Sequence, residues 1–565
     1  MKFLPAQLAF FLDNRSARKN VRVLLKLVLL FVALVLAFSV VFHVLMQAEG
    51  QEHSWLTGVY WTLTVMSTLG FGDITFHSDA GRLFSMLVLL SGVVFLLVLL
   101  PFTFIQFFYA PWMEAQRQLR APRALPLETQ GHVILTRYDP VAVSLIERLD
   151  LYKRQYVVVE SELKRALELH DLGVPVVLGD LDDRETYRLL RAERAALVVA
   201  GGDDFLNTNI AFTVRGLTEK TPIVAIARDP DSVDVMQLAG ATHVVELATM
   251  LGRSLARRTL GGETRANVIA RFDDLVIAEA PVLGTPLVGK KLADSGLRQA
   301  TGLSVVGLWQ RGRFTPAAPD SVIEPSSVMV LAGTEAQLAT FDELCVIYNA
   351  PDDPVLILGG GRVGRAAASC LNERGVPYRI VEKNPSMIRD TDHYVLGSAA
   401  DRSVLETAGI TTSPTVIITT NDDAANIYLT IYCRRLRPNM QIISRANLER
   451  NIPSLHRAGA DLVMSYASMG ADAIFNVLER NEIFMVAEGL DVFRAEAPNT
   501  IVGRTLAESG IREETGCLVL AIETGGKMEV SPSPTTVITN GAELILIGTT
   551  DAEEKFMEEF VRRKR

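Results

Sequence analysis

The run Thr68-Leu69-Gly70-Phe71-Gly72-Asp73 lies between two long apolar stretches, and this arrangement constrains the fold more than any other segment of the chain. The stretch 23–46 contains Lys26 as its one charged residue and His43 near its end, and the stretch 84–108 contains no charge. Each is longer than the roughly 20 residues that a helix needs to cross a bilayer. We therefore expect two membrane-spanning helices joined by a loop that contains this run.

The apolar segment 55–66 between the spans is too short to cross a bilayer and predicts a half-length helix. Non-helical backbone survives at membrane depth only where it is buried in protein or lines water. A re-entrant half-helix followed by the glycine run meets this condition. The negative, C-terminal end of the half-helix would then point toward a path for cations.

Alternating glycines give the run Thr68 to Gly72 the chemistry of an ion filter. Glycine adopts backbone angles that are closed to other residues, so the chain can turn its carbonyls toward one axis. Stacked carbonyls, helped by the Thr68 hydroxyl, can replace the water around a cation. A glycine turn in a soluble loop is the alternative, and the two flanking spans disfavour it. One such strand cannot surround an ion, so we expect four identical chains around one pore.

Basic residues lie before the first span and after the second. They are Lys2, Arg15, Arg18, Lys19, Arg22, Lys26, Arg117, Arg120 and Arg123, whereas residues 47–81 contain no Lys or Arg. Because basic residues stay on the inner side, we expect a multi-pass protein of the inner (plasma) membrane with both termini in the cytoplasm. The first span is too long for a signal peptide, and no small-residue cleavage site follows it.

From about residue 130 the chain contains an internal duplication, most clearly in the matching segments 288–297 and 502–511. Short β-branched runs alternate with helical stretches of roughly 10 to 15 residues, which indicates βαβ units and a parallel sheet. Each copy ends in a small α+β subdomain. Its expected strands are 304–309 and 328–332 in the first copy, and 518–522 and 543–547 in the second.

The predicted fold class is a membrane α pore with two spans and a re-entrant pore helix, followed by two tandem α/β domains of the Rossmann type. The expected domains are a transmembrane pore domain (1–110), a proline-containing linker (111–130), a first Rossmann-like subdomain (131–275) with its C-terminal subdomain (276–349), and a second, nucleotide-binding Rossmann subdomain (350–492) with its C-terminal subdomain (493–565).

The second copy contains Gly359-Gly360-Gly361-Arg362-Val363-Gly364 between an expected strand and an expected helix, and Glu382 follows about 20 residues later. This spacing is the dinucleotide fingerprint, in which glycines admit the pyrophosphate and the helix N-terminus attracts it. Glu382 would accept hydrogen bonds from the ribose hydroxyls and would disfavour a 2′-phosphate. We therefore expect NAD, or ADP or ATP, rather than NADP. A Rossmann fold that has lost its ligand is the alternative.

The equivalent loop of the first copy is Thr136-Arg137-Tyr138-Asp139-Pro140-Val141, which has no glycine. The side chains of Tyr138 and Val141 would fill the space of the phosphates. Glu160 remains at the end of the next strand. We predict that the first copy does not bind a dinucleotide in the usual way.

Composition excludes other classes of protein and partner. The formal net charge is −9, and the acidic part follows the spans, which disfavours nucleic acid as a partner. The four cysteines, Cys345, Cys370, Cys433 and Cys517, show no CxxC spacing and fit buried positions in a reducing cytosol.

The filter run resembles the TVGYG signature of potassium channels, with Leu69 and Phe71 as apolar replacements that can pack behind the filter. Together with the repeats, it resembles prokaryotic two-transmembrane potassium channels with tandem RCK (regulator of potassium conductance) domains. The resemblance implies a potassium-selective channel in a lipid membrane, gated by intracellular ligands on a ring of eight RCK units below a homotetrameric pore. It assigns K⁺ coordination to Thr68, Leu69, Gly70, Phe71 and Gly72, and nucleotide binding to residues 359–364 and Glu382. Arg445 could also approach a phosphate.

The same resemblance raises the question of Ca²⁺. Asp180 keeps an acid that such channels often have after the third strand, and Asp182, Asp183, Asp203 and Asp204 lie near it in sequence. Calcium prefers several oxygens on one compact site. However, an acidic pair that some calcium-gated relatives carry is replaced by Ile226 and Arg228. The alternative is that these acids are solvated residues at helix starts.

Other functions fit the sequence less well. A nucleotide-regulated potassium uptake transporter normally has four filter repeats in one chain and a separate nucleotide domain. An NAD-dependent oxidoreductase would need a catalytic domain after the fingerprint, so we expect no enzyme activity. The spans lack the arginines of a voltage sensor.

We also expect the second span to bend at Ser91-Gly92 or at Pro101. The alternative for Gly92 is that it lets two helices pack closely.

Overall fold

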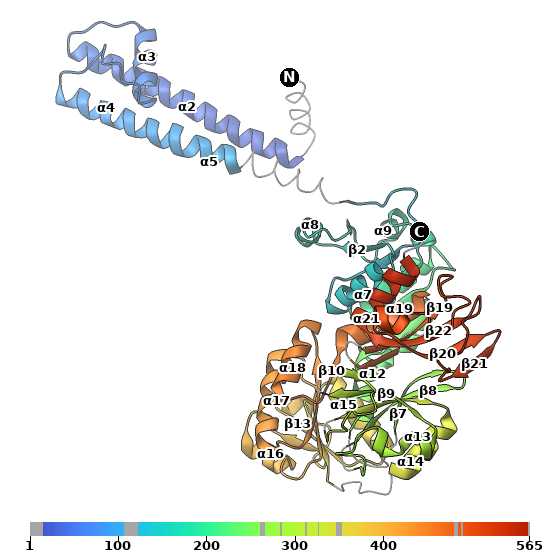
Figure 1. Cartoon of the computed structure of the whole chain (residues 1–565). Coiled ribbons are helices and arrows are strands. Elements are labelled where there is room, and N and C mark those ends of the chain that lie inside the picture. The colour runs from blue at the N-terminus through green and yellow to red at the C-terminus, as the bar shows by residue number, and fades with distance from the viewer. Residues whose placement is uncertain are drawn as a thin grey trace. The chain divides into compact units, whose positions relative to one another are not determined.

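The computed structural model describes residues 15–106, 122–259, 266–282, 285–310, 313–325, 327–345, 353–479, 484–487 and 490–562. The chain forms two compact units, Met1–Ala121 and Pro122–Arg565, which are described separately (Figure 1).

The first unit contains the predicted spans and the predicted half-length helix. Its elements are α2 (Arg15–Ala48), α3 (Trp55–Met66), α4 (Asp79–Gly92), the π-helical segment η1 (Val93–Leu99) and α5 (Leu100–Phe104). The segments Leu25–Ala48 and Asp79–Thr103 are long and apolar enough to cross a membrane. The half-length helix therefore has the predicted bounds, and its N-cap is the Ser54 side chain, which accepts a hydrogen bond from the Thr57 N–H.

A cluster of aromatic side chains holds α3 against both spans. The Trp61 ring of α3 lies 4.9 Å from the Phe42 ring of α2 and 5.8 Å from the Phe84 ring of α4, measured between centroids. Phe76, from the loop after the filter run, completes the cluster at 5.2 Å from Trp61. These contacts fix where α3 ends and therefore where the filter run begins.

Gly92 lies where the second span touches the end of α3. A Cβ atom at this position would come within 2.3 Å of the Met66 carbonyl oxygen. The structure thus supports the close-packing interpretation of Gly92. Directly after it the helix changes to π geometry over Val93–Leu99, and Pro101 lies in α5. Both features are common causes of helix kinks. They favour a bend in this span, and the bend itself stays a prediction.

Each copy in the second unit begins with a six-stranded parallel sheet. The strand orders are β3-β2-β1-β4-β5-β6 and β14-β13-β12-β15-β16-β17, which is the doubly wound order of dinucleotide-binding folds. The strands of the first sheet are β1 (Val133–Leu135), β2 (Tyr156–Glu160), β3 (Val176–Leu178), β4 (Leu197–Ala200), β5 (Ile223–Ile226) and β6 (His243–Val245). Those of the second are β12 (Val355–Leu358), β13 (Tyr378–Glu382), β14 (Tyr394–Leu396), β15 (Thr415–Ile418), β16 (Gln441–Ala446) and β17 (Leu462–Ser465).

Helices connect these strands. In the first copy they are α7 (Pro140–Leu151), α8 (Leu163–Asp171), α9 (Arg184–Leu189), α10 (Asp204–Arg215), α11 (Val233–Leu238) and α12 (Leu247–Arg257). In the second they are α15 (Arg362–Glu373), α16 (Arg402–Ala408), α17 (Asp423–Leu436), α18 (Ile452–Ala458) and α19 (Tyr466–Glu479). The predicted tandem Rossmann fold is confirmed.

A smaller antiparallel sheet follows each parallel sheet, with orders β10-β9-β11-β8-β7 and β18-β19-β22-β20-β21. The first contains β7 (Asn267–Phe272), β8 (Leu275–Pro281), β9 (Ser304–Gln310), β10 (Arg313–Pro316) and β11 (Val328–Gly333), with α13 (Leu297–Thr301) and α14 (Glu335–Cys345). The second contains β18 (Phe484–Ala487), β19 (Leu490–Glu496), β20 (Leu518–Thr524), β21 (Lys527–Val530) and β22 (Glu543–Thr549), with α20 (Ile511–Thr515), α21 (Thr550–Phe556) and η8 (Met557–Arg562). The four expected strands are present, and both sheets begin before the expected boundaries at 276 and 493.

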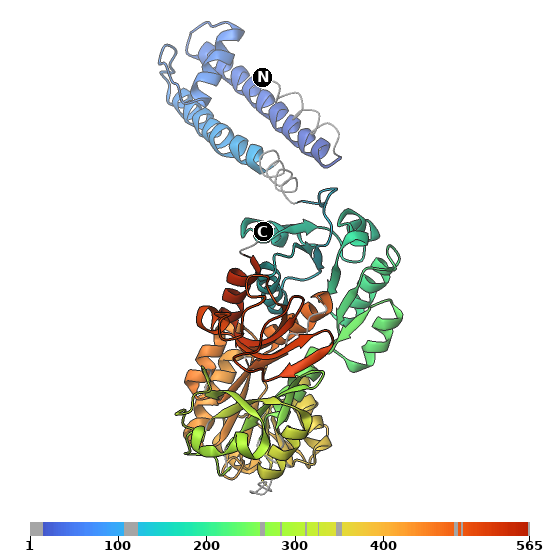
Figure 2. The ribbon, with the colours of Figure 1, turned by 45° about the vertical axis from the view of Figure 1, so that its right-hand side comes forward.

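The two copies are interlocked by helices that cross from one to the other. Helix α12 packs on α15, and α19 packs on α7. Glycines allow the close approach: a Cβ at Gly252 would lie 2.5 Å from the Val363 carbonyl oxygen, and one at Gly470 would lie 2.8 Å from the Val141 side chain. The second small sheet and α21 share a buried core with α7 of the first copy (Figures 1 and 2).

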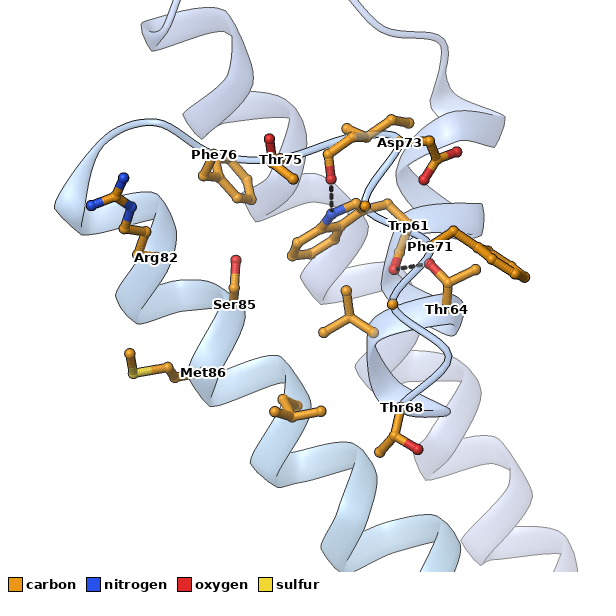
Figure 3. Close-up of a pocket in the computed structure, with 15 residues that line it drawn as sticks. Trp61, Thr64, Thr68, Phe71, Asp73, Thr75, Phe76, Arg82, Ser85 and Met86 are labelled. Carbon is orange, nitrogen blue, oxygen red and sulfur yellow. Dashed lines mark hydrogen bonds between the residues drawn. The ribbon is translucent and has the colours of Figure 1, made fainter.

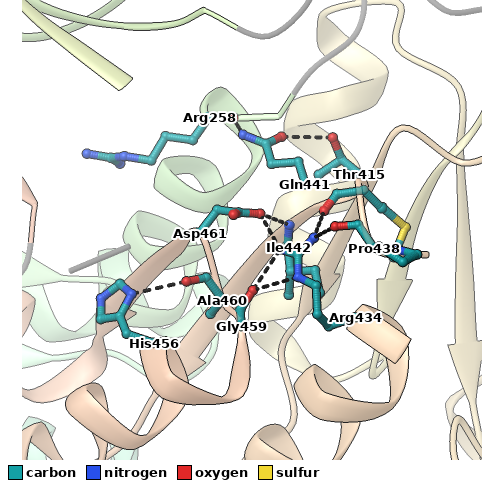
Figure 4. A network of polar contacts seen from close by, with 11 residues as sticks. Arg258, Thr415, Arg434, Pro438, Gln441, Ile442, His456, Gly459, Ala460 and Asp461 are labelled. Carbon is teal, nitrogen blue, oxygen red and sulfur yellow. Dashed lines mark hydrogen bonds and ion pairs between the residues drawn. The ribbon is translucent and has the colours of Figure 1, made fainter. Parts of the chain in front are cut away.

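The duplication extends to individual polar contacts. Arg434, near the end of α17, donates hydrogen bonds to the carbonyls of Pro438, Met440 and Gly459 and pairs with Asp461 at 2.7 Å (Figure 4). Arg215 at the equivalent end of α10 binds the carbonyls of Thr218, Glu219, Thr221 and Gly240. Both arginines tie a helix end to the turn before the next strand.

Gly92→Ala is expected to push α4 away from the Met66 backbone, with an overpacking cost of about 1–3 kcal/mol. The purified protein should therefore unfold at a lower temperature and, as expected for a disturbed pore helix, carry less K⁺ into liposomes. Leu83→Ala is the matched control because Leu83 lies on the same helix α4 and is 71% exposed, and it should leave the unfolding temperature unchanged. An unchanged unfolding temperature and flux in Gly92→Ala would contradict the packing role.

Candidate functional sites

The filter run alternates between backbone conformations. Thr68, Gly70 and Gly72 have positive φ angles of 65°, 48° and 75°, whereas Leu69 and Phe71 between them do not. Such alternation directs successive carbonyls to one side of a strand, as a column of carbonyl ligands requires. Positive φ is natural for glycine and uncommon for threonine, so Thr68 is held in place by its surroundings.

Hydrogen bonds from the pore helix hold both ends of the run. At its start, the Thr68 and Leu69 N–H groups donate to carbonyls in the last turn of α3, those of Val65 and Thr64, each at 3.0 Å. After it, the Tyr60 hydroxyl donates to Asp73 at 3.2 Å. The Trp61 indole N–H donates to the Ile74 carbonyl at 3.1 Å (Figure 3). The filter run is thus positioned by backbone carbonyls and side chains of the helix that precedes it.

A cavity of about 560 Å³ lies between the filter loop and α4, where Ser85 and Met86 face it (Figure 3). Leu69 and Phe71 are 62% and 65% exposed, so the prediction that they pack behind the filter is not met within one chain. Their cover would have to come from another copy.

The glycines of the second copy have separate roles. Gly359 has a φ of 112°, which opens the tight turn after β12. A Cβ at Gly364 would lie 2.0 Å from the Gly359 carbonyl oxygen, so only glycine lets α15 pack this closely on the strand. Gly361 has an ordinary φ of −66° and no atom within 4 Å of its would-be Cβ. The open space over the N-terminus of α15 is where the fingerprint predicts a pyrophosphate.

Glu382 lies at the end of β13 beside this loop. Its carboxylate accepts hydrogen bonds from the Gly360 N–H at 2.7 Å and the Asn384 N–H at 2.8 Å. A carboxylate has about four acceptor positions, so capacity remains for ribose hydroxyls. Glu382 therefore shapes the loop in addition to its predicted contact with ribose.

Cationic side chains gather at the same loop. The Arg445 guanidinium lies 5.1 Å from the centre of the Tyr466 ring, and burial lowers its pKa, with the nearby positive charge of Arg362 adding to the effect. Arg362 itself donates to the Arg228 carbonyl of the first copy at 3.2 Å. No sequence pattern places Arg228 at this loop, because Arg228 belongs to the other copy and lies 134 positions from Arg362 in the chain.

The corresponding edge of the first copy is filled. The hollow beside Thr136, Arg137 and Asp139 measures about 10 Å³ and is partly closed by Ile474 from α19. A single water needs at least roughly this volume. Glu160 binds the Ser161 N–H and pairs with Arg165 at 3.2 Å. The filled edge gives a physical reason to expect no dinucleotide in the first copy, and this absence stays a prediction.

Three of the acids considered for Ca²⁺ bind backbone N–H groups. Asp183 and Asp203 cap α9 and α10, and Asp204 accepts hydrogen bonds from the Arg228 and Asp229 N–H groups at 2.8 and 2.9 Å. Within the described residues, no group of three or more His, Cys, Asp or Glu side chains is placed to hold a metal ion. A role for Asp180 thus stays a prediction without geometric support.

Comparison with known proteins agrees with this organisation. The TrkA-N domain profile matches residues 133–247 and 355–466, the TrkA-C domain profile matches 277–346 and 492–561, and an ion channel profile matches 30–109. The solved structure "GsuK channel bound to NAD" is 40% identical and similar over 97% of this chain and 100% of that chain, with a TM-score of 0.57.

Curated relatives match shorter regions. Potassium channel protein 1 of Methanocaldococcus jannaschii is 28% identical over 35% of this chain and 64% of its own length, so the match spans just under two thirds of that relative. The calcium-gated potassium channel TvoK of Thermoplasma volcanium is 27% identical over 36% of this chain and 60% of its own. With its pore unit, tandem repeats and near full-length similarity to the GsuK channel, the chain belongs to the family of potassium channels with tandem RCK domains.

Proposed function

We propose that the protein is a homotetrameric, potassium-selective channel of the inner membrane whose opening responds to NAD or an adenine nucleotide bound at the second repeat. One observation carries this proposal. A filter loop with alternating φ signs and an open glycine loop with an acid at the next strand end occur in the same chain. The NAD-bound structure of the GsuK channel supports the choice of ligand.

Conduction follows from the filter geometry. In a tetramer, four copies of the run would surround a dehydrated K⁺ with backbone carbonyls and Thr68 hydroxyls. Helix α3 ends at Met66, directly before the run, so the negative end of its dipole would favour a cation there. The exposed Leu69 and Phe71 side chains would be covered by the neighbouring subunit.

The second repeat would hold the nucleotide at the carboxyl end of its sheet. The pyrophosphate would occupy the open space at Gly361, with backbone N–H groups of α15 as donors. Arg362 and Arg445 would supply positive charge, and Glu382 would accept from the ribose. The ligand can shift the gate only if its affinity differs between open and closed states.

The helix that carries the nucleotide loop is also the one that touches the first repeat. Helix α15 packs on α12 through Gly252, and Arg253 of α12 binds Glu373 of α15 with two hydrogen bonds of 3.1 and 2.7 Å. A displacement of α15 by a ligand would therefore be transmitted through α12 to the first repeat, which follows the pore unit in the chain.

Exposed apolar faces support assembly into a ring of eight RCK units. Phe212 on α10 is 72% exposed, and Ile431, its equivalent on α17 by the duplication, is 53% exposed. Phe205, on α10 with Phe212, and Leu238, on the neighbouring helix α11, are both 87% exposed. Contiguous exposed apolar residues mark interaction sites on soluble domains. We infer that these faces contact neighbouring RCK units.

A second candidate ligand is Ca²⁺, because TvoK is named as a calcium-gated channel. Asp183 and Asp203 cap helices and Asp204 binds backbone N–H groups, so the geometry favours the nucleotide. A potassium uptake transporter is disfavoured because filter and nucleotide domains share one chain with a single filter run.

The unmodified protein should carry K⁺ and exclude Na⁺ in liposome flux assays. Gly70→Ala should abolish selectivity or conduction, because a left-handed conformation costs a non-glycine residue roughly 1–2 kcal/mol. Gly131→Ala is the matched control: Gly131 also has a positive φ, of 68°, with open space around it, but lies outside the filter. Equal Na⁺ and K⁺ flux through the unmodified protein would reject the proposed selectivity.

Gly361→Val should fill the phosphate space without straining the backbone, since φ at Gly361 is −66°. Glu382→Ala should remove the ribose acceptor. Each change should weaken NAD binding to the purified channel by about tenfold or more, or ~1.4 kcal/mol, in calorimetry, and reduce the effect of NAD on flux. Glu160→Ala is the control in the first repeat and should bind normally. Loss of binding in Glu160→Ala alone would mean that the site is in the other repeat.

Phe212→Asp and Ile431→Asp should lower the fraction of tetramer in detergent and weaken the response to NAD, because a charge would enter an apolar contact. Light scattering coupled to size-exclusion chromatography measures the first effect. Leu172→Asp changes an equally exposed leucine outside both faces and should have no effect. Complete tetramers with a normal response in both variants would contradict the assigned interfaces.

A further inference from the structure

A buried cluster of charged side chains joins the first repeat to the end of the second. Arg148 of α7 contacts Asp491 of β19 at 2.7 Å, Asp472 of α19 at 2.9 Å and Glu553 of α21 at 3.1 Å. The exposed fractions of these side chains are 13% for Arg148 and 2%, 8% and 0% for the three acids. Figure 1 shows α7, α19 and α21 side by side.

The charges in this cluster do not balance. One guanidinium faces three carboxyl groups, and a buried charge is costly unless a partner compensates it. Glu553 also accepts a hydrogen bond from the Tyr152 hydroxyl at 2.7 Å. Within the described part of the chain, neither oxygen of Asp472 has a partner in hydrogen-bonding geometry, and Asp472 interacts with Arg148 as an ion pair. Asp472 is therefore the acid least able to carry a negative charge.

The surroundings add negative charge. Glu449, from the short helix η7 (Glu449–Asn451), accepts hydrogen bonds from Ser144 and Ser468 at 2.6 and 2.7 Å and acts electrostatically on Asp472. Glu147 of α7 lies near Glu449, and its pKa is raised by burial and by that neighbour. The Cys517 thiol, near Glu553, has a pKa raised by burial to about 11 and stays neutral.

The titration of the acids agrees with the charge count. Burial raises the pKa of Asp472 to about 8, Asp491 and Glu553 oppose its ionisation as well, and Arg148 works in the other direction. Burial also raises the pKa of Glu553, and Asp491 adds to the rise. Burial and the charge of Glu553 raise the pKa of the Tyr152 hydroxyl, which stays protonated as a donor.

We propose that the Arg148 cluster is a proton-binding site that locks α7 of the first repeat to α19 and α21 of the second, and that its proton loss loosens this junction and alters channel opening. With a proton on one acid, Arg148 faces fewer negative charges and the cluster can stay dry. Without it, uncompensated carboxylates repel one another in a buried site. The junction then opens to admit water. The site is separate from the nucleotide loop and does not depend on it.

The sign and size of the effect follow from proton linkage. An acid with a raised pKa in the closed junction binds a proton that the opened junction has lost, so the closed form weakens as pH rises. For Asp472 the change spans the window from its ordinary value of 3.8 to about 8 and then levels off. The ratio of opened to closed junction should rise by up to about tenfold per pH unit for one proton.

Hydrogen exchange of the purified full-length channel tests the proposal. Protection factors of α7 and α21, corrected for the intrinsic pH dependence of exchange, should fall by up to about tenfold per unit between pH 6 and 8 and then level off. Asp472→Asn and Glu553→Gln keep the side-chain shape but cannot ionise, and both should flatten this slope. Asp551→Asn is the matched control, because Asp551 lies on the same helix as Glu553 and is exposed.

Potassium flux measured over the same pH range without nucleotide completes the test. The unmodified channel and Asp551→Asn should respond to pH, and the two cluster variants should respond less. An equal slope of exchange in the unmodified protein and in both cluster variants would overturn the proposal, as would a flux that changes equally with pH in all four proteins. Because no nucleotide is present, neither result depends on the nucleotide site.

Discussion

Close contact between the two repeats depends on two pairs of crossing helices. In each pair the last helix of one Rossmann subdomain packs on the first helix of the other, and Gly252 or Gly470 removes the side chain that would keep them apart. Packing at this distance leaves little free volume, and tightly packed interfaces change between discrete arrangements rather than deforming smoothly. Each junction between the repeats is therefore expected to switch between discrete packed arrangements.

The two candidate regulatory sites lie at different helix pairs between the repeats. Helix α15 begins at the glycine loop and packs on α12, whereas α7 carries Arg148 and packs on α19. A nucleotide would act on the first pair through α15, and a proton would act on the second through the carboxyl groups around Arg148. Each ligand, nucleotide or proton, changes the charge beside a helix that packs on the other repeat.

The sequence predicted the elements whose signal is local. The half-length helix, the filter run and the order of the Rossmann strands follow from apolar length, glycine spacing and the alternation of strands with helices. The glycine loop was predicted because its strand, helix and Glu382 lie within about 25 residues. Contacts between repeats left no such signal: Arg148 and Asp491 are 343 positions apart, and only folding brings them together. The exposure of Leu69 and Phe71 could not be predicted either, since their cover would belong to another subunit.

The comparison of the two repeats separates residues needed for folding from residues needed for a ligand. Arg215 and Arg434 make the same helix-end contacts, and Asp204 and Asp423 both bind backbone N–H groups after the fifth strand of their sheets. The two loops after the first strand of each sheet differ completely. They can differ because filling this edge in the first repeat does not disturb the shared contacts. Ile474 of α19 closes that edge, and Asp472 of the same helix reaches Arg148. Where the second repeat keeps an open space for a nucleotide, the first has become an internal junction, and the buried acids of that junction give it a response to protons.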